Sequence, residues 1–260
     1  MKNDDKNIEV DIVTIANKID DCLLNTLSNV SNQSYKEINH IIIYRQATSE
    51  EIQKIQGFSH SKKLLIYSQN GSGIASAFNN GINQGHGELI LFLNSGDSLV
   101  AADVIDQIIE SYSRERWLWA SGETISVTKK KYLKKHRKQH KTWESKLFWY
   151  RNPICHQSTI YSRKLVEQVG LYNEHLLMGM DYEYNIRSNL RSSPTLLYFP
   201  ISYYDTTGIS SIKVFEQFIN HKQVRDRYFQ LPFLKRLKVD AYCLLKAMYR
   251  LAMVPVKLWL

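Results

Sequence analysis

The sequence predicts an α/β fold, in which helices cover a mostly parallel central sheet. Short apolar stretches alternate with amphipathic stretches from residue 10 to about residue 121, which is the pattern of such a sheet. A length of 260 residues and a hydrophobic content of 43% allow one domain with a buried core, plus appendages. Ligands of such sheets bind beyond the carboxyl ends of the strands, so we expect the chemistry after Ala16, Tyr44, Tyr67 and Leu93.

The first half contains five expected strands, which start at residues 10, 38, 63, 88 and 117 and read VDIVTIA, INHIIIY, KLLIY, ELILFL and WLWA. Leu23, Leu27 and Val30 recur at helical spacing between the first two strands. Thr48 and Glu51 have the form of a capping box that starts the next helix. Residues 72–82 and 101–112 are two further expected helices.

The second half is less regular and predicts an α+β arrangement. STIYS from residue 158 and TLLYF from residue 195 are expected strands, and residues 163–169 and 181–190 are expected helices. Ile212, Phe215 and Ile219 share one face of a helix that continues towards Tyr228. Because no repeat or linker interrupts the chain, we expect one domain over residues 8–228 and a helical extension over residues 229–260.

Cysteine usage, hydropathy and charge restrict the class of protein. The three cysteines, Cys22, Cys155 and Cys243, lie far apart without CxxC spacing, which favours a reducing cytoplasm over a disulfide framework or zinc knuckle. The polar N-terminus lacks the apolar stretch of a secretory signal, and no apolar run is long enough to cross a bilayer. A formal net charge of +9 favours phosphates, nucleic acid or anionic lipid headgroups as partners.

An acidic turn, Asn94-Ser95-Gly96-Asp97, follows the apolar strand that ends at Leu93. A carboxylate there, with a glycine that allows close backbone approach, can hold a hard divalent cation that also bridges two phosphates of a nucleotide. Such a cation neutralises charge on a leaving diphosphate. Local composition alone also fits an ordinary polar turn.

Several motifs in order resemble those of the family 2 glycosyltransferases, in the branch that resembles colanic acid biosynthesis glycosyltransferases. SQNGSGIASAFNNGI and then GHGELILFLNSGD are similar to SEPDxGIYDAMNKGI and AxGxxxxFLNSGD. NPICHQSTIYSRKLVEQVGLYNEHLLMGMDYEYNIR resembles the HQxxFY, G-x-[FY]-[DN]-E and SDYEL-x-x-R stretch, and TTGISS resembles a GGVSS loop. The resemblance covers residues 10–228. It implies the GT-A fold and inverting transfer of a sugar from a nucleotide-sugar during bacterial surface polysaccharide biosynthesis.

The same resemblance implies a role for each matching residue. Asp97 matches the last acid of the DxD-type motif and would be the lone metal carboxylate for Mn²⁺ or Mg²⁺, while Asn94 matches the first acid. Asp181 matches the aspartate that deprotonates the acceptor hydroxyl, and its place at a helix start would help to keep it ionised. A plain N-cap is the alternative for Asp181, and Glu183 could replace it only in a rotated helix.

The remaining candidate site residues fall into two groups. The donor group consists of Ala16, Asn17, Tyr44, Arg45, Asn79, Ser95 and Gly96. The acceptor-pocket group consists of His156, Gln157, Gly208 and Ser210. A buried histidine with a satisfied ring is the alternative for His156, and a simple turn is the alternative for the loop of Gly208.

The chain departs from the branch at several acidic positions. Tyr44-Arg45-Gln46-Ala47-Thr48 replaces Asp-Gly-Gly-Ser, Gln69-Asn70-Gly71 replaces Glu-Pro-Asp, and Ser76 replaces a helix aspartate. Either phosphates and metal hold the donor at a changed base site, with Arg45 as a phosphate ligand, or activity has decayed while the fold persists. Because Asp97 and Asp181 remain, we expect an active enzyme, with a non-catalytic assembly subunit or a basic peripheral membrane-binding protein as the alternative.

Two basic segments point to a membrane. The run KKKYLKKHRKQHK at residues 129–141, followed by Trp143, Phe148, Trp149 and Tyr150, predicts contact with membrane phosphates or a lipid-linked saccharide acceptor. No nucleic-acid motif accompanies it, so nucleic acid is not an expected partner. From residue 233 a helical projection separates basic residues from apolar ones, which is typical of a helix in the interface of an anionic membrane.

Pro255 should bend or end this helix, and packing on the domain or on a partner is the alternative use of its apolar face. We therefore expect the protein to be cytoplasmic and peripherally associated with the inner face of the cell membrane. Its expected substrates are a nucleotide-sugar donor and a saccharide or lipid-linked saccharide acceptor.

Overall fold

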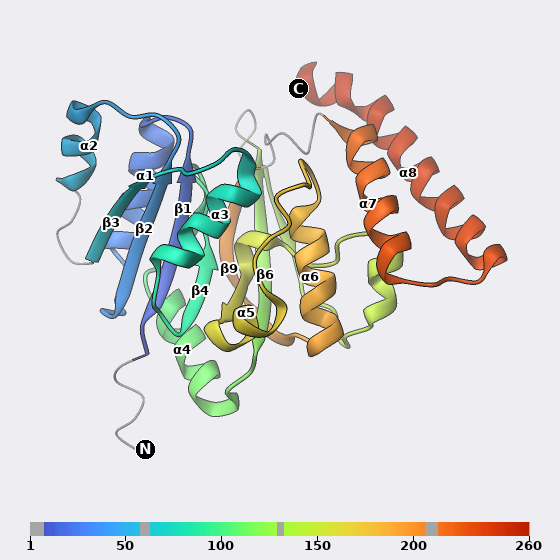
Figure 1. Cartoon of the computed structure of the whole chain (residues 1–260), viewed down its shortest axis with the longest axis horizontal. Helices are drawn as coiled ribbons and strands as arrows, with labels where there is room; N and C mark the ends of the chain where they lie inside the picture. Colours follow the sequence, from blue (N-terminus) through green and yellow to red (C-terminus); the bar gives the residue numbers. More distant parts are fainter. Residues whose placement is uncertain (1–7, 58–62, 129–132, 206–212, 260) are drawn as a thin grey trace.

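A computed structural model describes residues 8–57, 63–128, 133–205 and 213–259. Helices cover a central sheet, and a pair of long helices lies at one end of the molecule (Figure 1). The predicted acceptor-pocket residues Gly208 and Ser210 lie outside the described residues.

Six strands of the sheet run in the same direction: β1 (Val10–Ala16), β2 (Ile38–Tyr44), β3 (Lys63–Ser68), β4 (Leu89–Phe92), β6 (Trp119–Thr128) and β9 (Thr195–Asp205). The spatial order of the main sheet is β3-β2-β1-β4-β8-β6-β9-β5. The strands β8 (Thr159–Ser162) and β5 (Ser98–Leu99) are antiparallel to their neighbours, and β7 (Leu133–Arg137) forms a hairpin with β6. The predicted mostly parallel sheet is thus confirmed.

The helices are α1 (Asp21–Ser31), α2 (Ser49–Gln56), α3 (Gly73–Gln84), α4 (Val104–Glu115), α5 (Arg163–Val169), α6 (Met180–Arg191), α7 (Val214–Tyr228) and α8 (Phe233–Trp259). Two 3₁₀ turns, η2 (Ser145–Trp149) and η3 (His156–Ser158), lie between β7 and β8. The predicted capping box is present, because Thr48 and Glu51 each bond the other's backbone N–H at the start of α2.

Side chains on successive strand residues enter cores on opposite faces of the sheet. Val13 packs with Phe78 of α3 and Tyr184 of α6 on one face. Ile12 packs with Ile105 of α4 on the other face. Because both faces are covered, the central strands are mostly apolar on both sides, which is why the sequence shows apolar runs rather than strict alternation.

A buried ion pair joins the start of β1 to the start of α5. The carboxylate of Asp11 is fully buried and accepts hydrogen bonds from Arg163 Nη2 at 2.7 Å and from the backbone N–H of Gly87 at 2.7 Å. A Cβ on Gly85 would lie 2.2 Å from Asp11 Oδ2, so only glycine fits beside this carboxylate. The ion pair holds the loop before β4 and thereby the strand that leads into the acidic turn.

Three features differ from the sequence-based expectation. The second half was expected to be α+β, but its strands β6, β8 and β9 complete the same sheet as the first half. Part of the basic run forms β7. The helix α8 continues through Pro255 to Trp259, so of the two effects expected of this proline, a bend or an end, the helix end does not occur. The expected boundary at residue 229 falls between α7 and α8, and no helix in the described ranges is long and apolar enough to cross a membrane.

Candidate active site

The acidic turn begins where β4 leaves the centre of the sheet. Leu93 N–H donates to Val13 O at 3.0 Å and Ser95 N–H donates to Ile15 O at 3.3 Å, so the turn remains beside β1. Asp97 N–H closes the turn on Asn94 O at 2.9 Å. Its third residue, Gly96, has a φ of 94°, a left-handed conformation that favours glycine.

Thr26 of α1 holds the turn in one conformation. Gly96 N–H donates to Thr26 Oγ1 at 3.0 Å, and the Thr26 hydroxyl donates to Asp97 O at 2.8 Å. Asp97 is only 4% exposed. Sequence reasoning missed Thr26, because nothing in its local pattern distinguishes it from other polar residues of an amphipathic helix.

The amide oxygen of Asn94 fits a cation ligand. Asn94 Oδ1 is buried and, within the described residues, has no hydrogen-bond partner. Buried amide oxygens nearly always have a partner, so this atom calls for an explanation. The described residues contain no cluster of three or more His, Cys, Asp or Glu side chains that could hold a metal. The Asn94 amide oxygen and the Asp97 carboxylate are oxygen ligands of the kind that Mg²⁺ and Mn²⁺ use together with phosphates and water.

The ends of β1 and β2 form the edge next to this turn. Arg45 N–H donates to Ala16 O at 3.0 Å, and Gln69 N–H donates to Tyr44 O at 2.7 Å, so three strand ends stay in register. Asn17 and Arg45 are exposed at this edge. The backbone thus places the predicted donor residues of β1 and β2 beside the acidic turn.

The loop before α3 is closed by polar residues at the positions where the resemblance led us to expect acids. Ser76 Oγ donates to Asn70 O at 2.7 Å, Asn70 N–H donates to Asn80 Oδ1 at 2.6 Å, and Gln69 Nε2 donates to Gly73 O at 2.8 Å. The substitutions have a structural role, because they fold the loop onto α3.

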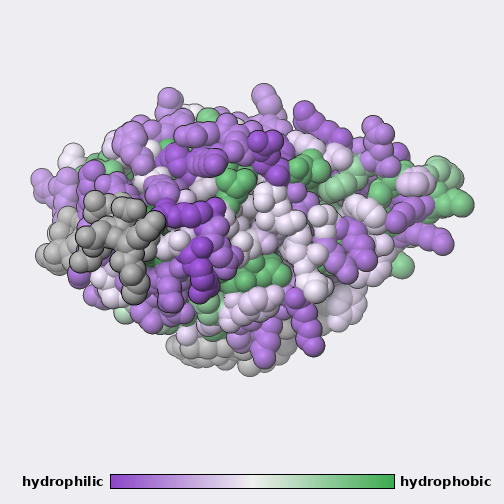
Figure 2. Space-filling view, turned by 90° about the horizontal axis from the view of Figure 1, so that it is seen from below, coloured by the Kyte–Doolittle hydropathy of each residue, from purple (hydrophilic) through white to green (hydrophobic). Residues whose placement is uncertain are grey.

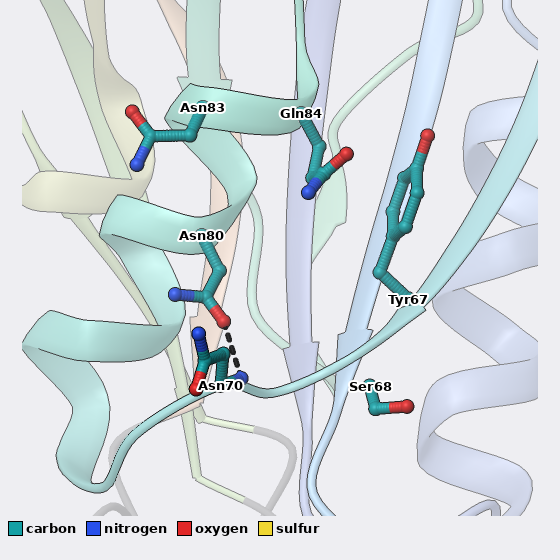
Figure 3. A pocket seen from close by; sticks show the side chains of 6 residues that line it. All are labelled: Tyr67, Ser68, Asn70, Asn80, Asn83 and Gln84. Carbon is teal, nitrogen blue, oxygen red and sulfur yellow. Dashed lines mark hydrogen bonds between the residues drawn. The ribbon is translucent and has the colours of Figure 1, made fainter.

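Beside this loop lies an open polar cavity of about 390 Å³ (Figure 3), lined by Tyr67, Ser68, Asn70, Asn80, Asn83 and Gln84. Figure 3 shows the bond between the Asn70 backbone and the Asn80 side chain at one end of it. None of the predicted site residues lines this cavity. It is therefore distinct from the acidic turn.

Asn79 supports a neighbouring loop with its side chain. Its Nδ2 donates to Tyr172 O at 3.0 Å and to Glu174 Oε1 at 2.7 Å, and its Oδ1 accepts from Tyr172 N–H at 2.8 Å. The amide is 97% buried, as the exposed fraction of Asn79 is 3%. These contacts occupy the groups with which Asn79 was expected to bind the donor.

His156 lies in a buried aromatic cluster. Its ring stacks on Phe78 with a centroid distance of 4.8 Å, packs against Phe92 at 4.9 Å, and bonds Tyr172 Oη through Nε2 at 2.9 Å. Burial lowers the pKa of His156 to about 3, so the ring is neutral. The buried, satisfied histidine that was the alternative reading fits these contacts. Gln157 is also buried and accepts a bond from Cys155 Sγ at 3.3 Å.

Asp181 stands in the first turn of α6 and is held by Asn152. Asn152 Nδ2 donates to Asp181 Oδ2 at 3.0 Å. Burial raises the pKa of Asp181, and the bonds from Tyr182 N–H and Asn152 only partly oppose this effect. The helix start was expected to keep the carboxylate ionised, but desolvation outweighs it. A raised pKa is useful in a general base, because such a base binds the abstracted proton more tightly.

Asn152 is a positioning residue that sequence reasoning missed. Its Oδ1 accepts from Asn185 Nδ2 at 3.3 Å, and Asn185 Oδ1 accepts from Tyr161 Oη at 2.7 Å. This chain of amides fixes which face of Asn152 points to Asp181. The one available signal was its place at the start of the matching NPICHQ stretch.

Glu183 is engaged in a structural ion pair two residues further on. Both of its oxygens accept from Arg187, at 2.9 Å each, and one also accepts from Tyr228 Oη. Only 3% of the residue is exposed. Glu183 therefore has no free face with which to replace Asp181.

One short segment, residues 152–156, links the surroundings of the two acids. At one end Asn152 bonds Asp181. At the other end burial raises the pKa of the Cys155 thiol, and the nearby charge of Asp97 raises it further while Arg137 opposes it. Next to Cys155, His156 packs on Phe92, two residues before the acidic turn, so this segment joins the surroundings of Asp181 to those of Asp97.

Comparison with known proteins identifies the family. The family described as "Glycosyl transferase family 2" matches residues 12–170. An uncharacterized glycosyltransferase of Mycobacterium tuberculosis is 26% identical over 206 residues, 78% of this chain and 77% of the relative. A PGL/p-HBAD biosynthesis glycosyltransferase of Mycobacterium bovis is 24% identical over 244 residues, 90% of this chain and 84% of the relative.

Solved structures show the same fold at low sequence identity. Staphylococcus aureus TarS 1–349 in complex with UDP-GlcNAc has a TM-score of 0.69 at 12% identity, covering 91% of this chain and 71% of that one. The mannosyltransferase PcManGT of Pyrobaculum calidifontis, in complex with GDP-Man and Mn²⁺, has a TM-score of 0.65 at 13% identity, covering 97% and 74%. The fold is therefore GT-A, and the chain belongs to glycosyl transferase family 2.

Proposed function

We propose that this protein is an inverting, metal-dependent glycosyltransferase that moves a sugar from a nucleotide-sugar to a saccharide hydroxyl. The observation that carries the proposal is the segment 152–156, in which Asn152 bonds Asp181 and His156 packs on Phe92, two residues before the acidic turn of Asp97. A carboxylate that anchors a diphosphate and a carboxylate that takes a proton must both reach the same sugar. A segment that links the surroundings of the two acids supports such an arrangement.

Asp97 and Asn94 would hold the divalent cation, Mn²⁺ or Mg²⁺, through one carboxylate and one amide oxygen. When bound, the cation stabilises negative charge on the leaving diphosphate. The unpartnered Asn94 Oδ1 supports this assignment, and the solved relative with GDP-Man and Mn²⁺ has the same fold. Thr26 keeps the turn in the conformation that presents both oxygens.

Asp181 would act as the general base in this reaction. It accepts the proton of the acceptor hydroxyl while the hydroxyl oxygen bonds to the anomeric carbon, and the bond from that carbon to the diphosphate oxygen breaks on the opposite face. One displacement of this kind inverts the anomeric centre. Burial and the bond from Asn152 give the carboxylate the basicity and the direction that the step needs.

The donor would lie along the ends of β1 and β2. The relatives of known structure bind UDP-GlcNAc and GDP-Man, which supports a nucleotide-sugar donor here. Arg45 is exposed next to Ala16 and could bind a phosphate, which would offset the acids that the loop before α3 lacks. Ser95 and Gly96 complete the donor side of the turn.

A lipid-linked saccharide is the acceptor class that the charges favour. Burial lowers the pKa of Lys246 on α8, and the positive charges of Arg151, Arg250 and Arg137 lower it further. These cations come from α8, from β7 and from Arg151, the residue before Asn152, which bonds Asp181. Such a cluster suits the phosphates of a lipid-linked acceptor. The PGL/p-HBAD biosynthesis relative and the colanic acid resemblance support a surface glycan or glycolipid as the product.

A degenerate subunit without activity is the second candidate. The observation in its favour is the loop before α3, where Ser76 and its neighbours bond one another in place of the missing acids. This candidate predicts that no sugar nucleotide binds with any metal.

Calorimetry with UDP-, GDP- and dTDP-sugars and Mn²⁺ or Mg²⁺ tests the proposal. One donor should bind only with metal, Asp97→Asn should abolish that binding, and Asp181→Asn should retain binding but lose transfer. Glu167→Gln is the control, because it removes an exposed carboxylate of α5 and should leave donor binding intact. Binding of no donor, or full transfer by both Asp variants, would contradict the proposal.

A further inference from the structure

Helix α8 contacts the rest of the protein through a narrow face of small and charged residues. Val239 is 1% exposed and Ala247 is 5% exposed. Between them, Asp240 pairs with Lys222 at 3.0 Å and with Arg225, both from α7. Cys243 Sγ lies 3.5 Å from Tyr150 O. These residues recur every three or four positions, so they define one face of the helix.

The large apolar residues of α8 lie on the opposite face and are exposed. Exposed fractions of Phe233, Leu234, Leu245 and Tyr249 range from 67% to 77%. The same face carries further exposed apolar residues, Leu237, Leu244, Met248 and Leu251. Figure 2 shows apolar side chains gathered at the end of the molecule that carries α7 and α8. An apolar surface of this kind on a folded domain marks a binding surface.

The charges of α8 favour an anionic bilayer over a second copy of the chain. Asp240 is the only acid between residues 233 and 259, and it is taken by cations of α7 on the inner face. Exposed Lys235 and Lys238 border the apolar face. Two such helices facing each other would bring like charges together, whereas anionic headgroups would neutralise them. The apolar arc also includes Leu234, Leu245 and Tyr249, which is wider than a two-helix seam requires.

We propose that the exposed apolar face of α8 docks in the headgroup region of an anionic membrane, with the helix parallel to the surface. This proposal is independent of the transfer chemistry, since it rests on the exposure and the charges of α8. No helix of the described ranges could span a bilayer, which is consistent with interfacial binding. Docking would also orient the site, because α8 lies against the segment that leads to Asn152. Lys235 Nζ of α8 is 4.0 Å from the ring centroid of Trp149, three residues before Asn152.

Flotation of the full chain with vesicles tests this docking. Wild type should float with phosphatidylglycerol/phosphatidylcholine vesicles and much less with phosphatidylcholine alone. Leu237→Asn with Leu245→Asn should lower the partition coefficient by roughly tenfold or more. Lys235→Gln with Lys238→Gln should lower it by about tenfold on anionic vesicles only.

Leu177→Asn with Leu190→Asn is the matched control, because it removes two leucines that are 82% and 59% exposed outside α8. It should float like wild type, and thermal melting should show that all variants fold. Equal flotation of the Leu237/Leu245 variant and wild type would overturn the proposal. So would a wild type that fails to float and is instead a dimer by light scattering, with the Leu237/Leu245 variant a monomer.

Discussion

Replacement of Asn152 by alanine probes how Asp181 is positioned. Asn152 donates one hydrogen bond to the carboxylate, at 3.0 Å, and is itself held by Asn185 at 3.3 Å. A hydrogen bond to a charged group contributes roughly 1.5–3 kcal/mol. Because Asp181 is partly exposed, we take the lower part of that range, which corresponds to a loss of about tenfold in kcat.

The pH profile separates this role from a general loss of structure. Burial already raises the pKa of Asp181, and the bond from Asn152 opposes that shift. The alanine variant loses the opposing bond, so the pKa of Asp181 rises further and the acid limb of kcat moves to higher pH. A residue that only supported the fold would lower kcat without moving this limb.

The assay is steady-state transfer from pH 5 to 9, with donor affinity measured separately by calorimetry. We expect a lower kcat, a displaced acid limb and an unchanged donor Kd. Asn25→Ala is the control, because Asn25 is an exposed asparagine of α1. An Asn152→Ala enzyme with wild-type kcat and an unmoved acid limb would refute the positioning role.

Three further predictions concern stability and the acidic turn. Arg163→Met leaves the fully buried Asp11 unpaired and should lower the free energy of unfolding by about 3–5 kcal/mol in urea denaturation. Burial lowers the pKa of His40 and of His156 to about 3, whereas their ordinary pKa is 6.5. Below pH 6.5 the unfolded chain therefore binds more protons at these histidines than the folded chain does. Each histidine should therefore cost about 2 kcal/mol of stability between pH 7 and pH 5, and His156→Gln should flatten that part of the profile. Asn94→Leu removes an unpartnered buried oxygen, so the melting temperature without metal should stay equal or rise, while metal-dependent donor binding should weaken. Asn94→Asp should instead strengthen metal-dependent donor binding.

Local patterns predicted the first half of the fold well. The strands β1 and β2 match the predicted starts at Val10 and Ile38, because buried parallel strands are continuously apolar. The capping box of Thr48 identified α2, because its bonds lie within four residues. The strand β7 was missed, since five residues that read LKKHR have no apolar periodicity and pair only because β6 is beside them.

Sequence motifs were enough to name the two candidate acids, whereas contacts between distant segments of the chain could not be predicted. Asp97 and Asp181 could be named from matching motifs, but the bond between Asn152 and Asp181 joins positions 29 apart in the chain. The packing of His156 against Phe78 and Phe92 likewise depends on three separate segments. For α8, the projection separated basic from apolar residues, but only the packing of Val239 and Ala247 against the body shows which face points outward.

The most direct test of the central claim is a crystal structure of the protein with its donor and Mn²⁺. We predict that the cation contacts Asn94 Oδ1 and the Asp97 carboxylate, and that the anomeric carbon faces Asp181. A donor seated instead in the polar cavity beside Tyr67 and Gln84, with Asp97 and Asp181 both distant from its diphosphate and sugar, would contradict the account.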